Sequence, residues 1–292
     1  MSESPRALTQ RDVDRFAALS GDRAPMHVDP AWARGSALGA TVAHGMMLYA
    51  LIGAALSRRL AVACPRGWLP LEQTLAFAAP TWVGDAVAVE TAAAGDAMRF
   101  ATRVRNQQGA TTVDGEAVAA EAAAGYPRRR IDDSFALGDL ESDAALLDLA
   151  LGQSASVVRT FTDADLDEYV DLVGDRNPPV VDARAARAIG LPARMVAGPL
   201  VGALLQQALG ERLPGRGCDW VRQRLSFHST AVLGEPLTAS VTVTRLRRDG
   251  GLASLGCVVS ADDGRSVATG EALLRVAGLA PARAPGALHG AG

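Results

Sequence analysis

Two stretches of the chain decide its fold: residues 9–22 read TQRDVDRFAALSGD, and residues 162–175 read TDADLDEYVDLVGD. They align at a constant offset of 153 positions, and the alignment continues without a gap through 40 residues. Gly, Asp, Arg and Pro recur at matched positions, so chance similarity is a poor explanation. The sequence therefore contains one structural unit twice.

Both copies begin with the signature of a short helix. Thr9 precedes Asp12 by three residues, which resembles a capping box with Asp in the usual Glu position. Val13, Phe16 and Leu19 then follow the period of one apolar helix face. The second copy keeps the same spacing, so each unit is predicted to open with an amphipathic helix.

Each copy continues with a mostly apolar segment, Met46–Leu60 in the first and Leu200–Leu213 in the second, which is predicted to form a buried helix. Short strand-like runs separated by turn signals follow. The expected strands are Leu71–Phe77, Ala86–Ala93, Met98–Arg105 and Thr111–Ala122, then Trp220–Val232, Leu237–Leu246, Leu252–Ser260 and Ser266–Val276. Each copy is thus predicted to be an α+β unit with an antiparallel sheet.

The repeats divide the 292 residues into four parts. Residues 1–125 are expected to form one domain and residues 161–276 a second, each large enough to bury a core. Residues 126–160, which include the triplet Arg128–Arg130, are expected to link them. The tail at residues 277–292 is rich in Ala, Gly and Pro and is expected to be disordered.

The composition, with 49% hydrophobic and 21% charged residues, is typical of a soluble globular protein. A net charge of −3 gives no support for binding nucleic acid or an anionic membrane. The apolar run Met46–Leu56 is too short to span a bilayer, and the N-terminus lacks the order of a signal peptide. Cys64, Cys218 and Cys257 form no metal-binding or disulfide pattern, so a reducing cytoplasm is expected.

The first copy also carries residues that can move protons. Asp22 and His27 lie five positions apart on a loop containing Gly and Pro, just past the short helix. A His beside a carboxylate can take a proton from water and return one to another atom, because His titrates near neutrality and the carboxylate is an acceptor. Taken alone, such a pair is more often a turn aspartate and a packed histidine than an active site.

This stretch resembles the signature of the MaoC-like family and its (R)-specific enoyl-CoA hydratases. That signature runs aromatic, spacer, Gly-Asp-x-Asn-Pro-aliphatic-His, five residues and a small residue, which is matched here by Phe16, Gly21, Asp22, Pro25, His27 and Ala33. The following His-Gly of the family is similar to His44-Gly45. The resemblance spans about residues 8–124 and 160–276. It implies a double hot-dog fold, in which two units, each an antiparallel sheet wrapped around a long helix, pack as a pseudo-dimer.

By transfer from the family, Asp22 and His27 are the pair that activates water. Gly45 lies at the expected start of the buried helix, where a free amide could stabilise a thioester enolate. Alternatively, Gly45 only allows the helix to approach the sheet closely. His44 is expected to orient neighbouring loop groups, and Pro25 to support the loop.

Two features depart from the family pattern. Ala24 replaces the family Asn, so the loop lacks a side chain that would help to hold it. The second copy keeps Asp175 but has Val180 where His27 stands, so this half is expected to be inert and to shape the tunnel for the acyl group. Better-known fused double hot-dog hydratases carry the active motif in the C-terminal half, whereas here it is N-terminal.

The resulting hypothesis is a hydro-lyase that needs no cofactor or metal and acts on an enoyl or 3-hydroxyacyl thioester of CoA or an acyl carrier protein, in specialised acyl or polyketide metabolism. No nucleic acid or membrane is expected as a partner. The assembly is expected to be a monomeric pseudo-dimer or a homodimer, with the site between the halves. Two alternatives stay open: a hot-dog thioesterase, and a non-catalytic thioester-binding subunit, for which Ala24 is the support.

Overall fold

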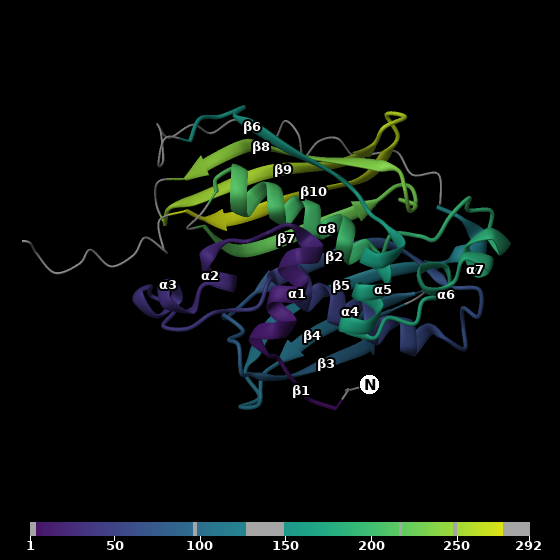
Figure 1. Ribbon diagram of the computed structural model, residues 1–292, viewed down its shortest axis with the longest axis horizontal. Coiled ribbons are helices and arrows are strands. Elements are labelled where there is room, and N and C mark those ends of the chain that lie inside the picture. Colours follow the sequence, from purple (N-terminus) through teal and green to yellow (C-terminus); the bar gives the residue numbers. More distant parts are fainter. Residues whose placement is uncertain (1–3, 96–97, 127–148, 216–217, 248–249, 277–292) are drawn as a thin grey trace, which may run out of the picture.

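The structure is a computed structural model that describes residues 4–95, 98–126, 149–215, 218–247 and 250–276 (Figure 1). The first repeat contains β1 (Arg6–Ala7), α1 (Gln10–Ser20), α2 (Pro25–Val28), α3 (Pro30–Gly35), α4 (Gly45–Leu60), β2 (Trp68–Phe77), β3 (Ala86–Ala93), β4 (Arg99–Arg105), β5 (Thr111–Glu121) and η1 (Ala122–Ala124). The second contains β6 (Ser154–Thr160), α5 (Asp163–Val173), α6 (Pro178–Val181), α7 (Ala183–Ala188), α8 (Gly198–Gln207), η3 (Ala208–Arg212), β7 (Asp219–Phe227), β8 (Pro236–Arg247), β9 (Leu252–Ala261) and β10 (Ser266–Arg275). The arginine triplet and the tail predicted to be disordered lie outside the described residues.

The described strands form one antiparallel sheet in the order β1-β3-β4-β5-β2-β7-β10-β9-β8-β6. β2 and β7 meet at its centre, where Glu72 pairs with Ser226 and Ala76 with Arg222. The long helices α4 and α8 contact each other on one face of the sheet (Figure 1). Each half is a hot-dog unit, so the predicted α+β double hot-dog fold is confirmed.

The predicted helix starts are also confirmed. Thr9 Oγ1 accepts from the Asp12 amide at 3.2 Å, and the Asp12 carboxylate accepts from the Thr9 amide at 2.9 Å. Thr162 and Asp165 make the same reciprocal pair in the second repeat. Two amides that lack intrahelical partners are thereby satisfied at each start, which fixes where α1 and α5 begin.

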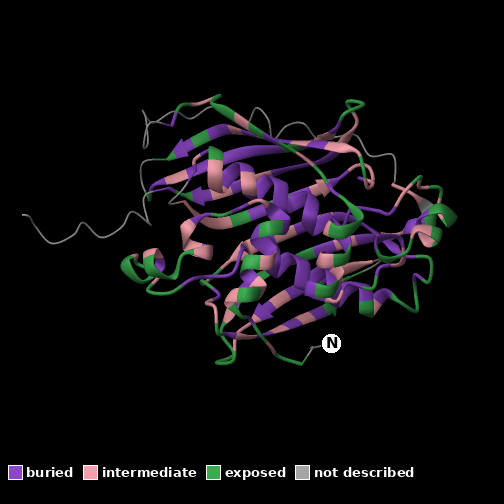
Figure 2. Ribbon diagram, viewed as in Figure 1, coloured by how far each residue is buried: buried purple, intermediate pink, exposed green. Residues whose placement is uncertain are grey.

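Helix α4 is buried on nearly all sides because its sequence is apolar all round (Figure 2). The helix predicted over residues 200–213 is α8 followed by the π-helical turn η3. Within the described residues, no helix is long and apolar enough to cross a membrane. The two central helices therefore supply the core that the two halves of the sheet share.

The largest differences from the sequence-based boundaries concern β6 and β7, and β2 begins at Trp68, three residues before the predicted start. Residues 154–160, expected in the linker, form β6 and pair with β8. Only Val157 of β6 is buried, so the strand carries almost no hydrophobic pattern that sequence could reveal. β7 ends at Phe227, five residues before the predicted end at Val232, because the His228 and Ser229 amides both bond the Val267 carbonyl.

Candidate active site

The loop that carries Asp22 begins where α1 ends. Gly21 ends the helix in a left-handed conformation with φ 78°, which favours glycine. A Cβ at this position would also lie 2.5 Å from the Gln207 side chain, so α8 packs directly against the turn. Asp22 follows and is only 1% exposed. Its Oδ1 accepts from the Ala24 amide at 3.0 Å, which holds the carboxylate inward.

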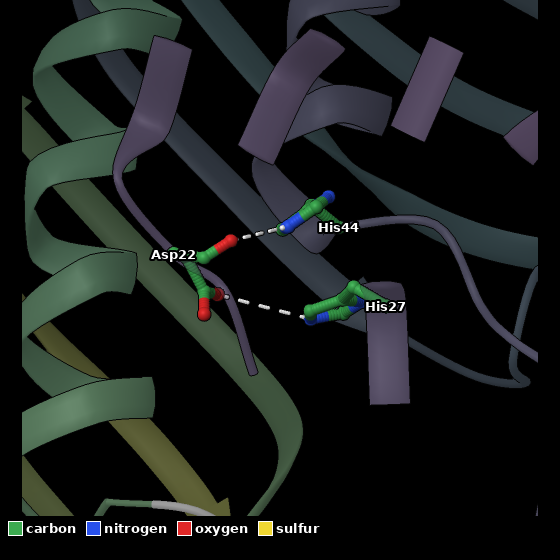
Figure 3. A group of neighbouring side chains, drawn as sticks. All are labelled: Asp22, His27 and His44. Atoms are coloured by element: carbon green, nitrogen blue, oxygen red, sulfur yellow. Dashed lines mark hydrogen bonds and ion pairs between the residues drawn. The ribbon is translucent and has the colours of Figure 1, made fainter. Parts of the chain in front are cut away.

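His27 lies on the short helix α2, whose first residue is Pro25. The fixed φ of proline suits the first helical position, which agrees with a supporting role. The buried His27 ring bonds through Nδ1 to the Val42 carbonyl at 2.8 Å. Because a carbonyl only accepts, Nδ1 carries a proton, and in the neutral ring Nε2 is the nitrogen without one. Nε2 lies 3.7 Å from Asp22 Oδ2, with the two groups facing each other (Figure 3).

His44 lies behind this pair and is fully buried. Its ring stacks on His27 with centroids 3.9 Å apart, and its Nε2 donates to the Asp22 carbonyl at 3.0 Å (Figure 3). Burial and the neighbouring His27 ring lower the pKa of His44 to about 3. A histidine that stays neutral cannot exchange protons near neutral pH, so His44 acts on the loop through its hydrogen bond.

Gly45 is the first residue of α4. Among the described residues, its amide has no hydrogen-bond partner. A Cβ here would lie 2.8 Å from the Trp220 ring and 2.9 Å from the Phe77 ring, which stack on each other at 5.6 Å. Gly45 therefore combines a close approach to the aromatic pair with an open amide at the positive end of a helix.

Asp22, His27 and Gly45 all line one cavity of about 320 Å³. The first repeat adds apolar walls, and the second repeat supplies the opposite side. Residues of the second repeat at the cavity are Gln206, Leu209, Gly210, Gly215, Cys218, Asp219, Trp220, Val221 and Arg275. The pair thus lies between the halves, as the sequence predicts, and the second copy forms part of the wall.

Sequence reasoning missed Gln206, a buried residue of α8. Its Nε2 donates to Asp22 Oδ2 at 2.7 Å, and its Oε1 accepts from the Met46 amide at 2.9 Å. The available signal was a pair of glutamines, Gln206 and Gln207, at the end of the otherwise apolar α8. Their direction depends on how α8 packs against the first repeat, which the sequence does not show.

The second repeat keeps the loop but changes its contents. Asp175 is buried, and its carboxylate accepts from the Asn177 amide at 2.9 Å and from the Tyr169 hydroxyl at 3.3 Å. Burial raises the pKa of Asp175 above the ordinary carboxyl value. Val180 and Ala197 stand at the positions of His27 and His44, so no titratable partner faces Asp175 from them. The remaining described histidine, His228, bonds Thr269 on the sheet at 2.8 Å and is not a cavity residue.

Asp22, His27 and His44 could also be considered as metal ligands, since one atom of each lies within 4.8 Å of the others. His44 Nε2 and His27 Nδ1 donate to carbonyl oxygens, an arrangement that metal-binding histidines also show. The imidazole nitrogens that remain are His27 Nε2 and His44 Nδ1, and the latter has no partner among the described residues. The two rings are stacked, with centroids 3.9 Å apart and planes 26° from parallel, so their in-plane lone pairs do not converge on one ion at coordination distance.

These features define a class of protein: a double hot-dog chain with an Asp–His pair in a cavity between its units. A family model described as MaoC like domain matches residues 1–116. The chain is 33% identical over 128 residues to the (R)-specific enoyl-CoA hydratase of Aeromonas caviae, covering 44% of this chain and 96% of that one. It is 31% identical over 126 residues to a mitochondrial 3-hydroxyacyl-(acyl-carrier-protein) dehydratase of Solanum lycopersicum, covering 42% and 75%.

A solved structure described as a MaoC-like dehydratase superposes with a TM-score of 0.73, covering 94% of this chain and 96% of that one at 14% identity. At that identity the likeness concerns the fold. Together with the sequence matches, it assigns the chain plainly: it belongs to the MaoC-like dehydratase family. The family model stops before the second repeat, in which the motif has lost its histidine.

Proposed function

We propose that this chain is a hydratase/dehydratase that reversibly adds water across the 2,3 double bond of an enoyl thioester. The observation that carries the proposal is the Asp22–His27 pair, with an open imidazole nitrogen, at the same cavity as the Gly45 amide. Relatives named for hydrating enoyl-CoA and for dehydrating acyl groups on a carrier protein support the reaction type. Both carriers, CoA and an acyl carrier protein, are compatible with these names.

The pair is arranged to share one water. The 3.7 Å between Asp22 Oδ2 and His27 Nε2 is too long for a direct hydrogen bond, so both atoms can bind the same water. In hydration the water oxygen attacks C3 and gives one proton to the pair. C2 receives one proton from the pair, which returns to its starting state. Dehydration is the same path reversed.

The Gly45 amide is suited to the charge that develops during this step. As the C3–O bond forms, electrons move toward the thioester carbonyl, whose oxygen becomes an enolate. A donor at the helix N-terminus stabilises that oxygen more than it stabilises the neutral carbonyl. His44 and Pro25 hold the loop that carries the pair.

The cavity suits an acyl chain because its walls are largely apolar, with Leu38, Leu48 and Leu209 among them. Arg275 lines the cavity yet is exposed, so this side opens to solvent. The thioester carrier is expected on the open side, and the acyl chain toward the apolar walls. Chain length and branching would then be limited by the walls that both repeats build.

In this proposal residues 1–125 form the catalytic domain, and the domain of residues 161–276 completes the cavity without catalysing. β2 and β7 pair edge to edge, so the two halves of one chain form a pseudo-dimer. A homodimer of such chains is compatible with this pairing. Cys64, Cys218 and Cys257 are free thiols, which agrees with a reducing cytoplasm.

The test is an assay of crotonyl-CoA, a longer enoyl-CoA and a branched one, in which loss of the conjugated double bond and release of free thiol are followed together. Water addition without thiol release is expected, with chiral analysis giving the (R)-3-hydroxyacyl product. Thiol release that outpaces hydration would favour the thioesterase. Binding of acyl-CoA without either reaction would favour the non-catalytic subunit.

A further inference from the structure

Gln206 connects the two repeats at the centre of the site. It belongs to α8 of the second repeat and is only 4% exposed, yet both ends of its amide contact the first repeat. Nε2 lies 2.7 Å from Asp22 Oδ2, and Oε1 lies 2.9 Å from the Met46 nitrogen. One side chain thus bridges the carboxylate and the helix that begins at Gly45.

The two contacts fix the orientation of the amide. The Met46 N–H can only donate, so the amide oxygen must face it, and the NH2 group must face Asp22. Asp22 Oδ2 is also the oxygen that faces His27 Nε2 at 3.7 Å. A hydrogen bond to an ionised carboxylate is among the stronger ones in proteins. Gln206 therefore fixes the carboxylate oxygen that must share a water with His27.

The second contact selects the amide that is left open at the start of α4. The Met47 and Leu48 amides both bond the His44 carbonyl, at 3.0 and 3.3 Å. Gln206 occupies the Met46 amide, so Gly45 alone keeps an unpaired donor among these first amides of the described helix. The same glutamine thus holds the carboxylate and accepts from the amide next to the open one.

We propose that Gln206 is a positioning residue for the reaction: it fixes Asp22 relative to the Gly45 amide across the repeat interface. The second repeat, which lacks an acid–base pair, thereby supplies a necessary part of the site in the first. This inference rests on the proposed hydratase function, because it concerns the same Asp–His pair.

The repeat symmetry shows that the bridge exists on one side only. The position that matches Gln206 is Gly53, which has no side chain, and the position that matches Met46 is Pro199, which has no N–H. A Cβ on Gly53 would lie 3.3 Å from the Pro199 ring. The glutamine side chain and the backbone N–H that it binds are both absent beside the second loop, which has no histidine. Both are present beside the first loop, which has His27.

The test compares Gln206→Leu and Gln206→Glu with a control, Gln73→Leu. Gln73 is also buried, but it bonds the Thr74 carbonyl and Thr102 and does not line the cavity. Gln206→Leu is expected to lower kcat about tenfold to hundredfold with little change in KM, as expected for a lost hydrogen bond to a charged group. Gln73→Leu is expected to keep wild-type kinetics.

Gln206→Glu provides a readout that a structural role would not give. A protonated glutamic acid can donate to Asp22, whereas an ionised one places a second negative charge beside it. Its activity should therefore be partly kept at low pH and fall as pH rises, with a step that the wild type lacks. Unchanged pH profiles in both Gln206 variants, with only a loss of thermal stability like that of Gln73→Leu, would overturn the proposal.

Amide hydrogen exchange at Met46 tests the bridge without substrate. The Met46 amide should be protected in the wild type and in Gln73→Leu, and exposed to exchange in Gln206→Leu. A Met46 amide that is equally protected in both leucine variants would contradict the bridge. A wild type that hydrates no enoyl thioester would instead refute the proposed function, and the bridge would then be decided by the Met46 exchange alone.

Discussion

The loop of residues 21–27 and its counterpart at 174–180 share a Gly-Asp start and a proline-led turn, yet they face different surroundings. The first opens on a cavity of about 320 Å³, whereas the corresponding space in the second repeat is about 10 Å³ and is lined by Tyr126. In the second loop the Tyr169 hydroxyl donates to Asp175. The second loop therefore contributes to packing, and it lacks both a cavity for substrate and a histidine that could act as a base.

The two loops are also held differently. Asn177 accepts from the Trp68 amide at 3.0 Å and donates to the Trp68 carbonyl at 2.9 Å, which fastens the second loop to the first sheet. Ala24, at the matching position, can make neither bond. The Arg23 amide donates to Glu211 at 2.8 Å, on the turn after α8, and the matching Arg176 amide donates to Ser57 Oγ of α4 at 2.9 Å. The first loop is therefore anchored by the same region that walls the cavity.

The largest expected effect comes from removing one half altogether. A fragment of residues 1–125 leaves β2 as an open edge strand, and it removes the α8 and β7 side of the cavity. The fragment should aggregate or pair with itself, and its hydration rate should fall on the order of 10²-fold or more because the site is no longer positioned. Size-exclusion chromatography with light scattering and the hydration assay measure both. A monomeric fragment with full activity would disprove the pseudo-dimer.

The next largest effect is a difference in kcat between substitutions of Asp22 and of Asp175. Asp22→Asn and His27→Gln should each lower kcat by a factor on the order of 10²–10⁴, the usual loss for a general acid or base. Asp175→Asn should leave kcat nearly unchanged, because Val180 gives its loop no base. Circular dichroism checks that all three variants fold. Equal losses from Asp22→Asn and Asp175→Asn would show that both loops act.

Local patterns explain why so much of the fold could be predicted. The capping residues Thr9 and Thr162, the apolar faces after them and the all-apolar α4 each act within one or two helical turns. Gly264, with φ 81°, lies in the turn between β9 and β10, whose sequence Asp262-Asp263-Gly264 is typical of a tight hairpin turn. These features depend on neighbours in the chain, and a repeat without gaps presents them twice.

The features that were missed depend on residues far apart in the chain. The bond between Asp22 and Gln206 joins positions 184 residues apart, through the packing of α8 on the first repeat. β6 has one buried residue, so its pairing with β8 is set by backbone hydrogen bonds and not by a pattern of side chains. The neutral state of His44 follows from complete burial, which a sequence pattern does not reveal.

A smaller effect concerns His44, where the second repeat has Ala197. Burial lowers the pKa of His44 from 6.5 to about 3, so the unfolded chain binds a proton that the folded chain does not. The contribution of neutral His44 to the free energy of unfolding is fully present above pH 6.5. It is lost as pH falls toward 3, by at most about 1.4 kcal/mol per pH unit.

The variant His44→Ala imitates the second repeat and should remove this dependence. At neutral pH it should lower the free energy of unfolding by about 1–3 kcal/mol, because a buried ring and its hydrogen bond are lost. The difference from wild type should shrink as the pH is lowered. Urea unfolding at several pH values measures it, and a difference that stays constant over the acid range would contradict a neutral His44.

The smallest effect is expected at Asp175, as a change in stability. Burial raises the pKa of this carboxyl, so folding favours its protonated form and the group costs stability as pH rises above the ordinary carboxyl value. In Asp175→Asn, Oδ1 can still accept from the Asn177 amide, and Nδ2 can donate to the Tyr169 hydroxyl. The variant should have a higher free energy of unfolding than wild type at neutral pH, and the gain should fade in acid. Urea unfolding at neutral and acid pH decides it: a variant less stable than wild type at neutral pH would show that the ionised carboxylate is needed by the second loop as well.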